Sequence, residues 1–408
     1  MKTENRTSAV SSPTLTAACD VTQCGGCSLT DTPYTVQLTQ KHRMLEKLLG
    51  KYGQVLPVLH AKEPFHYRNK VTRSYTMTKN ENGRFLLTGG IYAADSRRVI
   101  PVPHCQIEDT GAQAILGSVE AFCRDLKIEA WNTRTRRGVL RHAQVRASSD
   151  GRYLLTLVTG SNFFPARAEL VSRLRRVHPE IESIVHNVNG FDTGMILGDT
   201  ARSGIPDRVL FGNGTVTDTL CGLSFRISPQ SFYQVNHAGT ELLYRTAVSF
   251  AGLRPGDTVL DTYCGIGTIG LSAAKTFSEE NPSAAPLSLV GVELNRAAVS
   301  DAIANAKENH IRGARFYAGD AGKFLSDDRV HPDVLFMDPP RGGSDRAFLN
   351  AVLHAAPRTV VYISCGPETL ARDLGVLTKG YRVERIQPVD MFPMTGHCEC
   401  VCLLTHNK

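Results

Sequence analysis

The feature that most constrains the fold is a regular alternation of apolar runs and helical patterns in the C-terminal half of the chain. From about residue 228 onward, helical stretches separate apolar runs at 258–261, 287–293, 315–317, 334–338 and 360–364. Near-continuous apolar strands between helices predict a mostly parallel sheet that is covered on both faces. Ligands of such sheets bind at the carboxyl ends of the strands. The pattern therefore predicts an α/β fold with its site where these runs end.

A glycine-rich loop follows the first of these runs, from Asp261 to Gly270. Its glycines permit a tight turn and a close approach of the backbone to a ligand. Glu293 ends the next run, at about the offset where an acidic residue meets ribose hydroxyls. A dinucleotide and S-adenosylmethionine both fit this arrangement. Asp261 suits a cationic amino-acid group better than a phosphate, which favours S-adenosylmethionine, and we expect Cys264 to be a packing residue.

Three short motifs near the C-terminus predict chemistry on a nucleobase. Asp338 is followed by two prolines, which stiffen a strand end that can border a planar ring. Cys365 follows the last apolar run and precedes a helical pattern, whose free N–H groups would stabilise a thiolate. Thiolate addition to C6 of uracil makes C5 nucleophilic, and a base must afterwards remove the C5 proton. Glu399 is the candidate base.

These motifs resemble those of the RNA uracil-5 methyltransferases, the S-adenosylmethionine-dependent family that makes 5-methyluridine in rRNA and tRNA. The resemblance covers residues 19–404 and is carried by segments 225–236, 261–270, 338–343, 364–374 and 390–399. It implies a Rossmann-like class I methyltransferase domain with Cys365 as nucleophile and Glu399 as base. It also implies that the methyl donor is held by Gln234, Tyr263, Glu293, Asp320 and Asp338. At Thr268 the chain departs from some members, which carry asparagine.

A cysteine cluster near the N-terminus predicts a metal site. Cys19, Cys24 and Cys27 lie close together in a chain with 11 cysteines, and Cys105 is the candidate fourth ligand. Zinc and an iron–sulfur cluster both fit this spacing. The ribosomal branch of the family is similar, with three clustered cysteines and a fourth in a His-Cys segment that hold a [4Fe–4S] cluster. The resemblance therefore implies such a cluster and a 23S rRNA substrate, although the first gap is shorter here.

The rest of the sequence predicts four parts. They are a disordered tail at 1–17, a cysteine-cluster segment with a helix at 18–65, a central α+β RNA-binding domain at 66–227, and the methyltransferase domain at 228–408. The pattern predicts a helix from Tyr34 to Leu49 and antiparallel pairing in the central part. Five arginines could contact phosphates, and aromatic residues among the basic residues of 65–71 could stack on bases. The arginines are Arg134, Arg136, Arg137, Arg141 and Arg146.

The composition of the chain indicates which kinds of partner and which location to expect. A net charge of +7 is compatible with a polyanionic partner. Because no apolar run reaches eighteen residues and the N-terminal segment does not resemble a signal peptide, we expect a cytoplasmic protein without membrane spans. We expect a monomer that acts on RNA and not on DNA. The alternatives are a tRNA uridine-5 methyltransferase, a methyltransferase for another base, a non-catalytic RNA-binding assembly factor and an NAD-dependent oxidoreductase.

Overall fold

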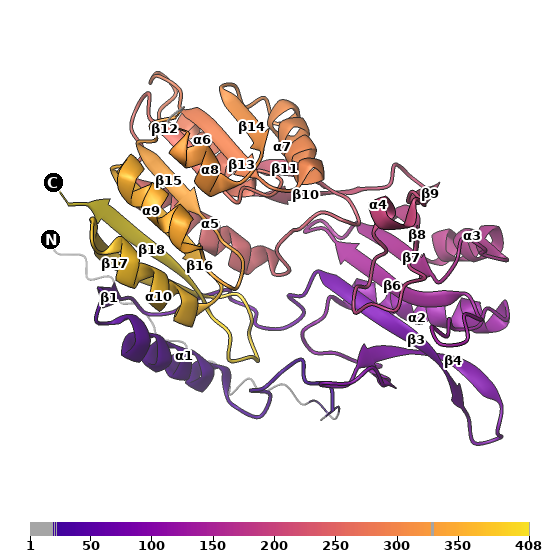
Figure 1. The fold of residues 1–408 in the computed structure, drawn as a ribbon. Helices are drawn as coiled ribbons and strands as arrows, with labels where there is room; N and C mark the ends of the chain where they lie inside the picture. Colours follow the sequence, from indigo (N-terminus) through magenta and orange to yellow (C-terminus); the bar gives the residue numbers. More distant parts are fainter. Residues whose placement is uncertain (1–18, 20, 22, 328–329, 408) are drawn as a thin grey trace, which may run out of the picture.

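Two sheets organise the chain in the computed structural model, which describes residues 19, 21, 23–327 and 330–407 (Figure 1). The predicted tail at 1–17 lies outside the described residues. A nine-stranded sheet carries the C-terminal half, and a seven-stranded sheet carries the central part. Figure 1 shows the two sheets side by side, with the N-terminal helix under the C-terminal sheet. Within the described part of the chain, no helix is long and apolar enough to cross a membrane.

The C-terminal sheet has the strand order β14-β13-β12-β15-β16-β18-β17. The bounds are β12 Thr258–Thr262, β13 Ser288–Glu293, β14 Ala314–Ala318, β15 Val334–Met337, β16 Thr359–Ser364, β17 Tyr381–Asp390 and β18 Glu399–His406. All pairs are parallel except those of β18, which runs antiparallel to both neighbours. The chain leaves β12 to one side for β13 and β14 and returns on the other side at β15. The predicted mostly parallel sheet is confirmed, and the switch point lies between β12 and β15.

Helices cover both faces of this sheet, because successive strand residues point to opposite sides. On β16, Val361 and Ile363 join a core with α5 (His237–Ala251), α6 (Thr268–Glu280) and α7 (Arg296–Glu308). Val360 and Tyr362 join the opposite core. That core is closed by α1 (Tyr34–Leu49), α8 (Ala321–Ser326), α9 (Arg346–Ala355) and α10 (Pro367–Leu377). The helix predicted over residues 34–49 is thus confirmed.

The N-terminal segment joins the C-terminal sheet. The short strands β1 (Gln54–Val55) and β2 (Leu59–His60) both pair in parallel with β17. The hairpin of β10 (Val216–Leu220) and β11 (Leu223–Ile227) also packs into the core of this sheet through Phe225 and its neighbours. Segments that flank the central part in sequence therefore support the sheet that carries the site.

The central sheet has the order β5-β4-β3-β6-β7-β8-β9. The bounds are β3 Lys70–Lys79, β4 Phe85–Tyr92, β5 Val99–Ile100, β6 Leu140–Ala147, β7 Tyr153–Thr159, β8 Ile181–Val188 and β9 Arg208–Phe211. Helices α2 (Thr110–Asp125) and α3 (Arg167–Val177) pack on one face, and the short α4 (Thr200–Ser203) precedes β9. Antiparallel pairing was expected throughout, but β7 and β8 are parallel, because α3 carries the chain back between them.

Candidate active site and cysteine cavity

The end of the β16/β18 ladder brings the predicted nucleophile and base together. Ser364 of β16 pairs with Cys400 of β18 in antiparallel register, so the next residues, Cys365 and Glu399, lie beside each other. Glu399 is also paired with Val389 of β17, which fixes it between two strands. Cys365 is partly exposed, whereas the Glu399 side chain is only 4% exposed. A buried carboxyl therefore borders an accessible thiol.

Electrostatic coupling within this group is strong. Burial and then the charge of Asp338 raise the pKa of Glu399 to about 8, while Arg341 opposes the rise. Burial alone raises the pKa of Asp338 to about 7. Burial, Glu399 and Asp338 also raise the pKa of the Cys365 thiol, and Arg341 again lowers it. These three acidic groups lie close together in a partly desolvated site, where the charge of Arg341 favours the ionised forms of Cys365 and Glu399.

The segment that carries Arg341 is held against α10. The hydroxyl of Thr369 donates to the carbonyl of Arg341 at 3.3 Å. Arg372 donates to the carbonyls of Gly342 and Ser344 at 3.0 and 2.9 Å. These bonds keep the Asp-Pro-Pro-Arg segment next to the turn from β16 into α10. Sequence reasoning did not assign Arg341 a role, although it directly follows the proline pair that was singled out.

The glycine-rich loop contains a buried carboxylate with a free oxygen. Asp261 is fully buried at the end of β12, and its Oδ2 accepts from the N–H of Gly270 at 2.8 Å. Its Oδ1 is buried and has no hydrogen-bond partner among the described residues. Burial is the main cause that raises the pKa of Asp261 to about 7. A buried, unpaired acceptor fits a ligand that brings a donor, such as the ammonium group of S-adenosylmethionine.

The predicted donor-binding residues gather along one edge of the sheet. Tyr263, Glu293, Asp320 and Asp338 lie at or just beyond the carboxyl ends of β12, β13, β14 and β15 respectively. Glu293 accepts from the N–H groups of Gly265 and Asn295 at 3.2 and 2.8 Å, which fixes its carboxylate beside the loop. Each strand of the switch-point region thus supplies one residue to this edge.

Asp320, Gln234 and Thr268 also have structural contacts. Asp320 caps α8, where its side chain accepts from the N–H of Lys323 at 2.9 Å. Gln234 comes from the loop before α5, and its carbonyl accepts from Asn69 of the central part at 3.1 Å. The hydroxyl oxygens of Thr268 and Tyr244 lie 3.1 Å apart. The two parts of the chain therefore contact each other at Gln234, one of the predicted donor-binding residues.

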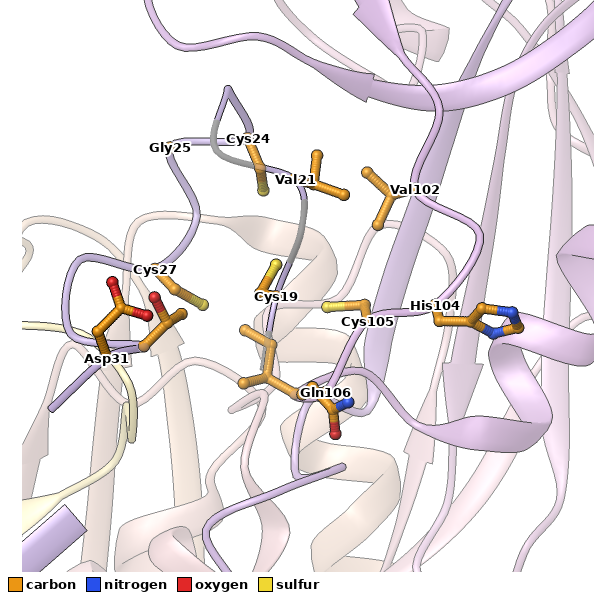
Figure 2. Close-up of a pocket in the computed structure, with 12 residues that line it drawn as sticks. Cys19, Val21, Cys24, Gly25, Cys27, Asp31, Val102, His104, Cys105 and Gln106 are labelled. Atoms are coloured by element: carbon orange, nitrogen blue, oxygen red, sulfur yellow. The ribbon is translucent and has the colours of Figure 1, made fainter. Parts of the chain in front are cut away.

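Four cysteines line one cavity of about 260 Å³ at the N-terminal side of the molecule. Figure 2 shows the sulfurs of Cys19, Cys24, Cys27 and Cys105 directed into the same space, while the His104 ring points away. Burial and the other three thiols raise the pKa of Cys27 to about 12. These thiols therefore need a cation to ionise together.

These four side chains are not arranged around a single ion. Among the described residues, no group of three or more His, Cys, Asp or Glu side chains is placed to hold one metal ion. Four thiols that line one cavity are nevertheless ligands that either a zinc ion or a four-iron cluster can take.

Two expectations about RNA contacts are wrong. Arg141 and Arg146 are each only 6% exposed. Arg141 donates to the carbonyls of Asn189, Phe191 and Thr193, and Arg146 donates to those of Pro229 and Ser231. Both arginines therefore hold loops in place and are not free for phosphates. Arg134, Arg136 and Arg137 are exposed in the turn before β6, so the expectation stands for them.

The aromatic residues of the 65–71 segment also have another role. Phe65 and Tyr67 pack against a small core that includes Met394, next to Cys27 and Cys105. The Tyr67 hydroxyl donates to the carbonyl of Pro393 at 3.1 Å. These partly buried rings lie between the cysteine segment and the loop before Glu399, and their expected stacking on RNA bases stays a prediction.

Comparison with known proteins agrees with this geometry. The family model described as tRNA (Uracil-5-)-methyltransferase matches residues 207–407. An uncharacterized RNA methyltransferase of Halalkalibacterium halodurans is 37% identical, over 95% of this chain and 83% of that protein. One of Clostridium acetobutylicum is 35% identical, over 94% of this chain and 81% of that protein. The chain belongs to the tRNA (uracil-5-)-methyltransferase family. It is therefore a SAM-dependent RNA methyltransferase, and the oxidoreductase alternative is set aside.

A solved structure has a similar fold. The crystal structure of the Pyrococcus abyssi tRNA (uracil-54, C5)-methyltransferase in complex with S-adenosyl-L-homocysteine matches with a TM-score of 0.74. The match covers 94% of this chain and 86% of that chain at 23% identity. At this identity the likeness shows the shared fold, which includes the class I methyltransferase sheet of this family member.

Proposed function

We propose that this family member methylates C5 of a uridine in RNA through a covalent bond between Cys365 and C6 of the base. The observation that carries the proposal is the register of β16 and β18, which sets the Cys365 thiol beside the Glu399 carboxyl. The free Oδ1 of Asp261 lies in the loop of the adjacent switch point and would receive the methyl donor's amino group. A non-catalytic assembly factor would need neither feature.

The proposed reaction has three steps. The Cys365 thiolate adds to C6 of uracil, which breaks the C5–C6 double bond and makes C5 nucleophilic. S-adenosylmethionine then supplies the methyl group to C5 and leaves as a neutral thioether. The Glu399 carboxylate removes the C5 proton, the double bond re-forms, and the C6–S bond breaks to release the thiolate. Arg341 favours both reactive anions by its charge.

Gln234, Tyr263, Glu293, Asp320 and Asp338 are the residues we propose to hold the methyl donor. Glu293 is already oriented by two backbone N–H groups, as expected for a carboxylate that meets ribose hydroxyls. Tyr263 has a left-handed backbone with a φ of 61°, which turns it out of the sheet at the start of the loop. Its ring packs edge-on against Phe348 at 5.3 Å between centroids, which limits its freedom.

We also propose that Cys19, Cys24, Cys27 and Cys105 hold a [4Fe–4S] cluster. Their convergence on one cavity supports this ligand set, and the resemblance to the ribosomal branch of the family favours a cluster over a single zinc ion. The cluster would have a structural role, because the thiolate reaction needs no electron transfer. Anaerobically purified protein should contain about four iron and four sulfide per chain if the proposal holds. Stoichiometric zinc without sulfide would overturn it.

We propose 23S rRNA as the substrate, because the four-cysteine pattern resembles that of the ribosomal branch. A tRNA substrate is the alternative, and the fold relative from Pyrococcus abyssi is named for a uracil of tRNA. The target base must leave its stack to reach Cys365 in either RNA. Methyl transfer to 23S rRNA fragments and to unmodified tRNA in parallel separates the two. Activity on tRNA alone would reject the ribosomal assignment.

The covalent mechanism is tested with RNA that contains 5-fluorouridine. Fluorine at C5 cannot leave as a proton, so Glu399 cannot complete the reaction and the adduct with Cys365 accumulates. We expect a denaturation-resistant protein–RNA complex with the wild type and S-adenosylmethionine, and none with Cys365→Ala. Methylation by Cys365→Ala would instead indicate a target, such as an exocyclic amine, that needs no thiolate.

A further inference from the structure

The loop between β17 and β18, residues 391–398, ends at Glu399 and is held by a distant part of the chain. Met394 lies in the middle of this loop and is fully buried. Its φ of 67° is left-handed, a conformation that a methionine keeps only where its surroundings impose it. The contacts of Met394 therefore control the course of the chain that leads into Glu399.

The hydrogen bonds of Met394 among the described residues come from the segment that follows Cys27, while Phe65 and Tyr67 pack against the same small core. The N–H of Met394 donates to Oε1 of Gln37 at 3.0 Å, and its Sδ lies 3.2 Å from Nε2 of Gln37. Its carbonyl accepts from the N–H groups of Ser28 and Leu29, both at 3.1 Å. The N–H of Gly396 donates to the hydroxyl of Ser28 at 3.2 Å. The backbone next to the cysteine cavity is thus bonded to the loop before Glu399.

Gln37 is the centre of this connection. It is fully buried on α1, and its Nε2 also donates to the carbonyls of Leu29 and Thr32 at 3.0 and 2.8 Å. One amide therefore joins the cysteine-bearing segment, the N-terminal helix and Met394. Without it, the buried N–H of Met394 would lose its partner and the left-handed turn would lose its main constraint.

We propose that Gln37 is a positioning residue for Glu399. The inference rests on the proposed function, in which Glu399 removes the C5 proton. Glu399 is joined directly to the 391–398 loop, whereas Cys365 follows β16, so a shift of the loop should move the carboxylate more than the thiol. Loss of Gln37 should therefore slow the release step and leave thiolate addition and methyl transfer intact.

This predicts a specific signature with ordinary uridine RNA. Gln37→Met, which keeps the size of the side chain, should accumulate a methylated covalent adduct, because the C5 proton is removed slowly. We expect at least a fivefold larger adduct fraction than in the wild type on a denaturing gel. Adduct formation with 5-fluorouridine RNA should stay within twofold. Gln40→Met, an exposed change on the same helix, should behave as the wild type.

Further variants distinguish a failure of the covalent mechanism from a failure of the positioning role of Gln37. Glu399→Gln should accumulate the adduct with ordinary RNA, and a wild type that forms no adduct with 5-fluorouridine RNA would refute the covalent mechanism itself. If that mechanism holds and Gln37→Met shows the wild-type adduct fraction, the positioning role is refuted, whatever the turnover. Gln37→Glu keeps the acceptor for Met394 but loses the hydrogen bonds that Nε2 donates to the carbonyls of Leu29 and Thr32, so it should show a smaller increase. It decides the matter if Gln37→Met is insoluble, since a wild-type adduct fraction there also refutes the role.

Discussion

At the residue scale, Arg341 affects the pH at which the proposed catalytic pair, Cys365 and Glu399, ionises. It lowers the pKa values of Cys365 and Glu399, which burial and the neighbouring carboxyls raise. Arg341→Gln removes that charge, so both groups should ionise at higher pH. We expect the midpoint of the single-turnover rate to rise by about one pH unit and the rate at pH 7 to fall roughly tenfold. Arg346→Gln, an exposed arginine nearby in sequence, is the control, and an unchanged midpoint in Arg341→Gln would contradict the assignment.

The negative charge of Asp261 should lower the stability of the fold but favour ligand binding. Its pKa is raised from 3.8 to about 7 by burial, so the folded chain keeps the proton that the unfolded chain loses. Stability from this group is full below pH 4 and is lost as the pH rises through 7. Asp261→Asn should raise the free energy of unfolding by roughly 1–2 kcal/mol at pH 8 and by little at pH 4.

The same change should abolish binding of S-adenosyl-L-homocysteine, since the acceptor for the amino group loses its charge. Urea unfolding at both pH values and calorimetric titration measure the two effects. Glu280→Gln is the control, because that carboxyl is exposed and both quantities should stay as in the wild type. Tight binding by Asp261→Asn would show that the free Oδ1 does not receive the ligand.

At the element scale, local patterns predicted the strands and helices but not how they pair and pack. The helix at 34–49 and the strands before Asp261, Glu293, Asp338 and Cys365 follow from periodicity and chain punctuation. The register that sets Cys365 beside Glu399 depends on the insertion of β18 between β16 and β17, which no local pattern encodes. The motifs and the family resemblance therefore predicted the two residues, and the structure supplied their geometry.

The same limit explains why Arg141 and Arg146 of β6 were wrongly expected to contact RNA. Alternating polar residues on a strand predict a solvated face, but that face of the central sheet lies under loops whose carbonyls need donors. Arg141 and Arg146 supply those donors. Burial by segments distant in sequence, near residues 189–193 and 229–231, decides their role. Only the tertiary structure could show it.

The contact between α1 and β17 yields a prediction on stability. Lys41 and Asp390 form an ion pair at 2.7 Å, with side chains 2% and 0% exposed. Tyr34 donates to the other carboxylate oxygen at 3.0 Å. Lys41→Met leaves the Asp390 charge buried without its cation and should reduce the free energy of unfolding by about 3–5 kcal/mol.

Chemical denaturation measures this loss. Lys47→Met on the exposed side of α1 is the control and should change stability by less than about 0.5 kcal/mol. A loss in Lys41→Met as small as in the control would mean that solvent replaces the cation, and that α1 is not anchored by this pair.

At the scale of the whole molecule, the site depends on three distant parts of the chain. The sheet edge supplies the proposed reactive pair and the proposed donor loop, and the central part supports Gln234 through Asn69. The cysteine segment holds the loop before Glu399 through Ser28 and Gln37. A cluster in the cysteine cavity would therefore act on the reaction through the order of the chain around it, without a redox step.

RNA binding depends on how charge is distributed over the whole surface. Arg134, Arg136 and Arg137 are exposed in one turn of the central part, and the chain carries a net charge of +7. Changing all three to glutamine should lower the slope of log affinity against log salt by about 2, given about 0.7 per phosphate contact with single-stranded RNA.

The matched control changes Arg254, Lys379 and Arg382 to glutamine, since these exposed residues lie just before or at the amino ends of β12 and β17, away from the site. Filter binding at several salt concentrations measures both slopes. Equal slopes in the two triple variants would mean that RNA responds to the overall charge, and that the turn before β6 makes no phosphate contacts of its own.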